Sequence, residues 1–356
     1  MSPPANESLA RRFLSSRGTV KRYVVGRNDQ SKELIEKFQI DGLIDDFDQS
    51  TSCWSGVPIL CSKVASSDAI VVNCSTSIAP LDVEKNLSRS GLRHIVAFGD
   101  LLRVAPQDIR QPWFVSQQRE DMKQHILEWA ELYAALDDKV SRETLLDVSR
   151  YRLTADPRYM RGYAVRLKDQ YFESFLDSRQ QVFVDAGGFD GDTTEEFCRR
   201  YPDYRRVLLF EPSAINMAVA QQRLGHMRDI EYFAIGLSDV EGTLRFNANA
   251  GPASAVCDDE GEAVPVTTLD HAVSEPVTFV KMDLEGWEVK ALHGARGHIE
   301  REAPQLAIGV YHRASDFRDV ARYVRSLNPS YRVRLRHYTQ GWSETVMYFT
   351  TSAINR

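Results

Sequence analysis

Short apolar runs alternate with amphipathic segments in two successive stretches of the chain. In the first stretch, the pattern predicts two helices, at residues 31–38 and 81–90, and four strands, at residues 21–25, 40–46, 69–74 and 94–102. Strands that alternate with helices are typical of βαβ units around a parallel sheet. We therefore predict a small Rossmann-like α/β domain over residues 19–105, preceded by a disordered N-terminus over residues 1–18.

The first turn of this predicted domain reads Gly26-Arg27-Asn28-Asp29. A turn that binds a pyrophosphate has two further glycines, which let the backbone approach the ligand. Because those glycines are missing, the sequence favours a structural or partner-facing role for the domain over a working nucleotide site.

Residues 106–178 are predicted to form a helical connector. Within residues 116–138, apolar side chains recur at steps of three and four: Met122, Ile126, Trp129, Tyr133 and Leu136. This spacing predicts one apolar face of an amphipathic helix that packs on the second domain. Residues 151–168 are rich in arginine and tyrosine, which is more typical of a solvated face than of a phosphate or sugar site.

The second stretch covers residues 179–356, and its pattern predicts seven strands with helices between most of them. The last two strands are close enough in the sequence to form an antiparallel hairpin. A doubly wound sheet closed by such a hairpin is typical of Rossmann-like class I methyltransferases. A dinucleotide dehydrogenase would instead continue with parallel strands.

The composition fits two folded domains, since the 356 residues are 43% hydrophobic and 26% charged. A net charge of −6 gives no basic field, so nucleic acid is not an expected partner. The five cysteines are scattered and never spaced as C-x-x-C, which argues against a disulfide framework or a zinc site. The sequence has no apolar run of about 18 residues, so we expect no membrane span and a cytoplasmic protein. A homodimer is a further possibility that we expect.

The loop Asp185–Gly191 contains the first candidate ligand-binding residues of the second stretch. Its glycines let the chain turn sharply and bring backbone N–H groups close to a ligand. Phe189 stands where a phosphate-binding loop would have another glycine, and aspartates crowd the loop. A pyrophosphate is disfavoured near carboxylates. A ligand with an amine and a sulfonium fits better, which indicates S-adenosylmethionine rather than NAD.

Three further strand ends carry matching signals. Glu211 lies roughly 20 residues beyond the glycines, where a carboxylate can accept both ribose hydroxyls. Ile235 and Gly236 close the third strand, where an adenine would lie. Asp283 ends the fourth strand, at the edge of the sheet where ligands of open α/β sheets bind.

These motifs together resemble the FkbM family of S-adenosylmethionine-dependent methyltransferases over about residues 171–350. The resemblance rests on the runs FVDAGGFDGDTTEEF, LLFEPS, AIGLSD, VTTLDHA, FVKMDLEGWEVKALHGA, YHRASDF and YRVRLRHY. It implies O-methylation with S-adenosyl-L-methionine as cofactor, on a hydroxyl of a sugar, glycan or polyketide-type small molecule. The cofactor-binding candidates are Asp185, Ala186, Gly187, Gly188, Asp190, Thr193, Glu211, Pro212, Ile235, Gly236 and Asp283.

A hydroxyl acceptor is a weak acid, so a base is expected at the site. His312, on the loop after the fifth strand, is the first candidate because imidazole titrates near working pH. His337 is the second, and Asp283 is placed near the methyl group by the resemblance. Trp287 and Tyr311 are candidates for binding the substrate, since aromatic rings stack on sugar faces.

The acids Asp283, Glu285 and Glu288 would suit Mg²⁺. Two of them fall at the start of a predicted helix, where acids are favoured by the helix dipole, so no metal is predicted. Two other functions stay open: an NAD-dependent oxidoreductase or nucleotide-sugar enzyme, and a non-catalytic, ligand-sensing relative of the methyltransferase fold. A lid formed by residues 247–261 is a further hypothesis.

Overall fold

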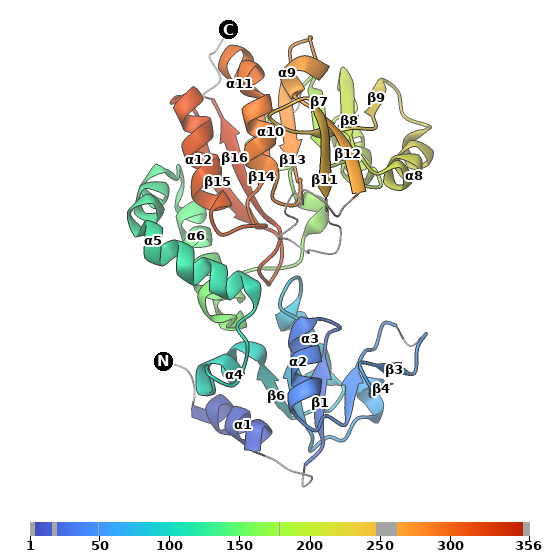
Figure 1. Ribbon diagram of the computed structural model, residues 1–356, viewed down its shortest axis with the longest axis vertical. Coiled ribbons are helices and arrows are strands. Elements are labelled where there is room, and N and C mark those ends of the chain that lie inside the picture. The colour runs from blue at the N-terminus through green and yellow to red at the C-terminus, as the bar shows by residue number, and fades with distance from the viewer. Residues whose placement is uncertain (1–3, 16–19, 49, 178, 247–261, 352–356) are drawn as a thin grey trace. The chain divides into compact units, whose positions relative to one another are not determined.

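The computed structural model describes residues 4–15, 20–48, 50–177, 179–246 and 262–351 (Figure 1). The chain divides into two compact units. The first unit comprises residues 1–120, 146–165 and 339–343, and the second comprises residues 121–145, 166–338 and 344–356. The predicted connector is therefore divided between the units.

The first unit contains a six-stranded sheet built from β1 (Arg22–Val25), β2 (Gly42–Ile44), β3 (Cys53–Trp54), β4 (Val57–Leu60), β5 (Ile70–Asn73) and β6 (His94–Ala97). The order is β3-β4-β2-β1-β5-β6, and every pair is parallel except β3 with β4. The helices are α1 (Pro4–Ser15), α2 (Asp29–Lys37), α3 (Pro80–Arg89) and α4 (Phe98–Val104), with short 3-10 turns at Ser62–Val64 and Pro157–Met160. The Rossmann-like outline predicted for this part is confirmed.

Two local predictions in the first unit are wrong. The N-terminal segment is not disordered over Pro4–Ser15, because α1 buries Ala10 and Phe13 completely. Residues 98–102 belong to α4 rather than to a strand. The apolar run there is buried on all sides, and such a run cannot be assigned to strand or helix from its period alone.

The predicted amphipathic helix is α5 (Trp113–Ala135), and it is followed by α6 (Lys139–Thr154). Trp129 and Leu136 are buried as expected, but Ile126 is 56% exposed and Tyr133 is 40% exposed. His125 has a non-helical backbone with φ −126° and ψ 30°, which breaks the helix at this point. The break shifts the phase of the helix, so one continuous apolar stripe is not formed.

The second unit contains a seven-stranded sheet built from β7 (Val182–Ala186), β8 (Arg206–Phe210), β9 (Ile230–Phe233), β13 (Phe279–Met282), β14 (Gln305–Gly309), β15 (Arg332–His337) and β16 (Thr345–Thr350). The strand order is β15-β16-β14-β13-β7-β8-β9. Only β16 runs antiparallel to its neighbours, β14 and β15. This topology confirms the class I methyltransferase sheet and its C-terminal hairpin.

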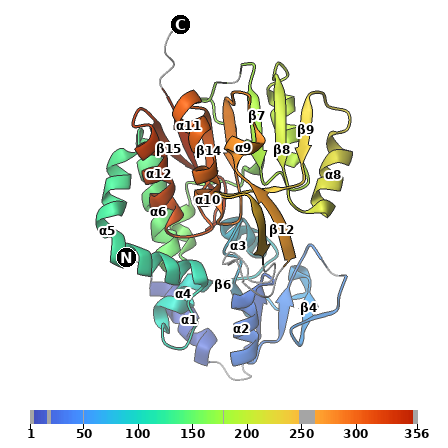
Figure 2. The same ribbon diagram turned by 45° about the horizontal axis from the view of Figure 1, so that its top comes forward.

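Helices cover both faces of this sheet (Figure 2). They are α7 (Asp192–Arg200), α8 (Ala214–Leu224), α9 (Leu269–Ala272), α10 (Glu288–Gly294), α11 (Arg296–Glu302) and α12 (Asp316–Leu327), with a 3-10 turn at Leu167–Asp169. On the α7 side, Phe197 stacks on Phe183 at 4.1 Å between ring centroids and also contacts the ring of Phe279. The Ser213 side chain caps α8 by accepting from the backbone N–H of Asn216.

A small second sheet of three strands, β10 (Gly236–Leu237), β11 (Gly242–Phe246) and β12 (Glu262–Thr267), follows β9. In this sheet, β11 and β12 form an antiparallel pair. Residues 247–261, for which we predicted a lid, lie outside the described residues. Among the helices that are described, none is both long and apolar enough to cross a membrane.

We predict that Phe197→Ala lowers the free energy of unfolding by about 3–5 kcal/mol, because it leaves a cavity among buried aromatic rings. Urea denaturation followed by circular dichroism measures the effect. Ile215→Ala, on an α8 side chain that is 78% exposed, is the control and should change the value by less than about 0.5 kcal/mol. Equal effects of the two substitutions would contradict the assigned core.

Candidate active site

A cavity of about 740 Å³ lies in the second unit, at the edge where its parallel strands end. It is lined by Gly187 after β7, Glu211 after β8, Asp283 after β13 and Tyr311 after β14. Ligands of open α/β sheets bind at this edge, and the volume is within the usual range for small-molecule sites. The sheet therefore brings residues from four separate motifs to one place.

The loop between β7 and α7 needs glycine at position 187. Gly187 has φ +77°, and a Cβ atom there would lie 2.0 Å from the backbone oxygen of Asp283. The backbone N–H groups of Gly187 and Gly188 both donate to the carbonyl oxygen of Phe210, at 3.0 Å each. The loop is thereby fixed against the ends of β8 and β13.

Asp185 does not line this cavity. Its fully buried carboxylate lies 2.9 Å from the Lys281 ammonium and accepts from the Thr194 hydroxyl at 2.7 Å. Lys281 also donates to the backbone oxygen of Gly187 at 2.7 Å. Burial would lower the pKa of Lys281, but Asp185 and Asp283 outweigh it and raise the pKa. In this position, the Asp185 carboxylate holds Lys281 and, through it, the loop at Gly187.

Glu211 is 7% exposed and lines the cavity. Its two carboxylate oxygens accept from the backbone N–H groups of Phe189 at 3.0 Å and Ser213 at 2.8 Å. Each oxygen keeps a further acceptor site, because a carboxylate oxygen has two lone pairs. The carboxylate is therefore fixed in one orientation beside the cavity.

The other predicted cofactor residues fall into two groups. Those that line the cavity are Thr193, Pro212, Gly236 and Asp283. Those that do not are Ala186, Gly188, Asp190 and Ile235. Ala186 is fully buried, and Asp190 forms an ion pair with Arg223. The first group can touch a ligand, whereas the second shapes the loops that hold it.

Asp283 is the centre of a polar network at one end of the cavity. Its carboxylate accepts from the hydroxyl of Tyr171 at 2.6 Å and from that of Tyr311 at 3.0 Å. Burial, and next the charge of Asp283, raise the pKa of both tyrosines well above the usual value. The two phenols therefore stay protonated and act as donors.

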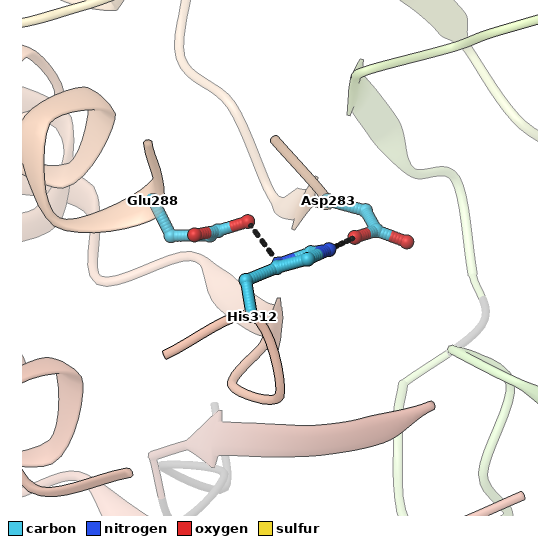
Figure 3. A group of neighbouring side chains, drawn as sticks. All are labelled: Asp283, Glu288 and His312. Atoms are coloured by element: carbon cyan, nitrogen blue, oxygen red, sulfur yellow. Dashed lines mark ion pairs between the residues drawn. The ribbon is translucent and has the colours of Figure 1, made fainter. Parts of the chain in front are cut away.

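His312 lies between two carboxylates (Figure 3). Its Nδ1 is 3.0 Å from Glu288 Oε1, and its Nε2 is 3.4 Å from Asp283 Oδ1 and also 3.4 Å from Glu285 Oε2. Burial alone would lower the pKa of His312, but these three carboxylates outweigh it and raise the pKa to about 10. The ring is therefore an imidazolium at neutral pH, which argues against the predicted role of His312 as general base.

Asp283, Glu288 and His312 also offer ligand atoms within 4.8 Å of one another, as a metal site would require. In Figure 3, however, the imidazole ring stands between the two carboxylates and turns a different nitrogen to each. A metal ion would use only one of those nitrogens. A protonated ring faces both carboxylates at once and offsets part of their negative charge.

His337, the second candidate base, does not line the cavity. It is 3% exposed in β15, and its Nδ1 lies 2.8 Å from the Thr345 hydroxyl oxygen. This position suits a packed strand residue, so the catalytic assignment of His337 is withdrawn. The predicted substrate residues Trp287 and Tyr311 both line the cavity.

Sequence reasoning missed Glu344, which lines the cavity next to the Asp283 network. Its carboxylate accepts from the side-chain amide of Gln170 at 2.7 Å. Burial, and next the charge of Asp283, raise the pKa of Glu344 to about 7. Glu344 and Gln170 are 174 positions apart, so no local motif joins them.

Backbone strain is a further signal at this site. Tyr171, Phe189, Glu285 and Glu344 all have positive φ, between 44° and 73°, and all four line the cavity. Such conformations cost about 1–3 kcal/mol each for residues with side chains and cluster at functional sites. Three of the four, Tyr171, Glu285 and Glu344, belong to the acidic end of the cavity.

Comparison with known proteins agrees with this geometry. The profile of one family, described as "Methyltransferase FkbM domain", matches residues 185–331. This part of the chain belongs to the FkbM methyltransferase family. The second unit, which contains it, is a methyltransferase by family and fold. No curated protein matches the chain significantly.

Among solved structures, methyltransferase FkbM from Methylobacillus flagellatus is 24% identical, with a TM-score of 0.73, over 98% of this chain and 94% of that one. It shows a shared fold. An rRNA methylase from Streptococcus thermophilus is 20% identical over 50% of this chain and 90% of that one, with a TM-score of 0.34. Fibrillarin from Aeropyrum pernix, in complex with S-adenosyl-L-methionine, is 9% identical over 54% and 76%, with a TM-score of 0.35. The last two resemblances are too weak to carry an argument.

We predict that His312 does not titrate between pH 6 and 8, because three carboxylates hold it as an imidazolium. Histidine-selective NMR, with the signal assigned from His312→Gln, measures its pKa. The raised pKa also means that the stabilisation from the charged ring is complete below about pH 6.5 and is lost as the pH rises towards 10. A midpoint near 6.5 would contradict the assigned charge.

Proposed function

We propose that the second unit is an S-adenosylmethionine-dependent O-methyltransferase, acting on a hydroxyl of a sugar, glycan or polyketide-type small molecule. The observation that carries the proposal is the pairing, in one cavity, of a fixed carboxylate at Glu211 with the polar network around Asp283. The Glu211 carboxylate suits the hydroxyls of a ribose. The network around Asp283 suits a positively charged sulfur with an acceptor beside it.

The residues present fit this cofactor better than a dinucleotide. Glu211 would hold the ribose hydroxyls, and Gly236 and Pro212 would lie beside the adenine. Asp192 and Glu196 also line the cavity, and their carboxylates disfavour a pyrophosphate. When bound, S-adenosylmethionine supplies an electrophilic methyl group on a sulfonium.

The acidic end of the cavity would hold the acceptor and remove its proton. Glu344 is proposed as the general base, because its pKa of about 7 lets it take up a proton at working pH. The amide of Gln170 orients its carboxylate. The acceptor oxygen loses its hydroxyl proton to Glu344, while the Asp283 carboxylate is held by Tyr171, Tyr311 and His312. A carboxylate in this position favours a sulfonium nearby.

Trp287 limits the acceptor space on another side. Its indole N–H donates to the Ser238 hydroxyl at 3.2 Å, which fixes the ring at the cavity wall. A fixed aromatic wall suits a ring-shaped acceptor such as a sugar. The cytoplasmic location and the homodimer stay predictions from the sequence.

We predict that Glu211→Gln weakens S-adenosylmethionine binding about 10- to 100-fold, because a charged acceptor of two ribose hydroxyls becomes neutral. Isothermal titration calorimetry measures the loss. Glu241→Gln, at a half-exposed carboxylate paired with His271 outside the cavity, is the matched control and should bind like the wild type. Heat from NAD but none from S-adenosylmethionine would overturn the proposal.

We predict that Glu344→Gln lowers kcat about 10²- to 10⁴-fold while the affinity for S-adenosylmethionine changes less than about 3-fold. In the wild type, kcat should rise with pH through about 7, as the carboxylate loses its proton. The variant should lack that rise. The assay follows transfer of a labelled methyl group to hydroxyl compounds selected from a panel of sugars and polyketides. An unchanged pH profile in the variant would remove Glu344 as the base.

A further inference from the structure

The first unit has a cavity of its own, of about 980 Å³. It is lined by residues at the ends of three strands: Gly26 after β1, Asp45 after β2 and Ser75 beyond β5. In the sheet, β1 has β2 on one side and β5 on the other. After β1, the chain therefore adds β2 on one side of this strand and then β5 on the other. Open α/β sheets bind ligands at such switch points.

The inner surface of this cavity is apolar. Val25 and Ile44 contribute from the sheet, and Val83 and Leu87 contribute from α3. Asn86, also on α3, adds a side chain that can both donate and accept hydrogen bonds. A flat heterocycle with polar edges fits a surface of this kind.

An acid lies at the end of β2, where nucleotide-binding domains hold a ribose. Asp45 comes 19 positions after Gly26 (45 minus 26), close to the spacing of about 20 residues typical of that acid. Its Oδ1 accepts from the backbone N–H groups of Phe47 at 2.9 Å and Asp48 at 3.0 Å. Its Oδ2 lies 2.8 Å from Nε of Arg27. The carboxylate is therefore fixed in place beside the cavity.

Two cations stand at the rim of the cavity, Lys63 and Arg89, and both are exposed. Arg89 forms no ion pair with a carboxylate anywhere in the described part of the chain. Within the described residues, Lys63 interacts with Asp46 through the attraction of their opposite charges. The Asp46 carboxylate accepts from the Ser62 backbone N–H at 2.7 Å. Cationic side chains of this kind bind phosphate groups. Of the two other carboxylates that line the cavity, Asp48 is paired with Arg27 at 2.9 Å, whereas Asp46 lies near Lys63 and opposes a phosphate there.

Phe47 adds an aromatic surface to the rim, since its side chain is 92% exposed and lines the same cavity. The exposed ring offers a face on which a base can stack.

The start of α2 is not available to a phosphate. The Asn28 side chain caps the helix by accepting from the Ser31 backbone N–H at 3.1 Å, and its amide donates to the Cys74 carbonyl at 2.7 Å. The glycine-poor turn is thus not a pyrophosphate cradle, as the sequence predicts. The candidate phosphate-binding groups are instead the cationic side chains of Lys63 and Arg89.

We propose that the cavity of the first unit binds a nucleoside diphosphate. The base lies between the apolar surface and Phe47, one ribose hydroxyl donates to Oδ2 of Asp45, and Lys63 and Arg89 hold the phosphates. This site is separate from the methyltransferase cavity and does not depend on the function proposed for it.

Isothermal titration of the full chain with ADP, GDP, CDP and UDP tests the proposal, with inorganic pyrophosphate as the comparison ligand. At least one nucleoside diphosphate should bind about 10-fold more tightly than pyrophosphate, because base and ribose add contacts. Binding of pyrophosphate alone would mean a simple anion site, and no binding of any nucleotide would also overturn the proposal.

Two variants localise the site. Arg89→Glu should weaken the nucleotide about 10-fold or more, whereas Arg93→Glu, at an exposed arginine outside the cavity, should not change it. Asp45→Asn should weaken the nucleotide but not pyrophosphate. The circular dichroism spectrum and the melting temperature, measured on the same samples, should be unchanged and show that the chain is folded. Equal binding by the Arg89 and Arg93 variants would contradict the assignment.

Discussion

The Lys281 ammonium lies fully buried beside the Asp185 carboxylate and joins β13 to the loop after β7. The same ammonium donates to the backbone of that loop at Gly187, which in turn approaches the backbone of Asp283 too closely for any side chain. Removing one partner of such a pair would leave an unpaired buried charge, which commonly costs about 3–5 kcal/mol. The position of Asp283, and with it the acidic end of the cavity, depends on this ion pair.

The acidic end of the cavity concentrates negative charge around one protonated ring. Glu288 and Asp283 face opposite nitrogens of His312, and Glu344 stands on the far side of the Asp283 network. The backbone has positive φ at Tyr171, Glu285 and Glu344, so the surrounding structure holds these residues in conformations that cost free energy. In our proposal, the excess negative charge attracts a sulfonium, and Glu344, whose pKa is raised to about 7, is the base.

The sequence predicts much of the second unit because its strands end in compact motifs, and the order of those motifs along the chain determines the sheet. Glu211 and Asp283 could be placed at the cavity from their positions at strand ends. The charge of His312 could not, because it depends on three carboxylates that only the fold brings together. Glu344 and Tyr171 belong to no local motif, so the sequence did not place them at the cavity. The sequence also did not predict α1 and α4, because the burial of their apolar residues depends on tertiary contacts.

A crystal structure of the full chain with S-adenosylhomocysteine tests the central claim most directly. Our account predicts that the ribose hydroxyls contact the Glu211 carboxylate and that the sulfur faces the end of the cavity formed by Asp283, Tyr171 and Glu344. A ligand bound with its ribose away from Glu211, or an empty cavity at saturating ligand, would contradict the account.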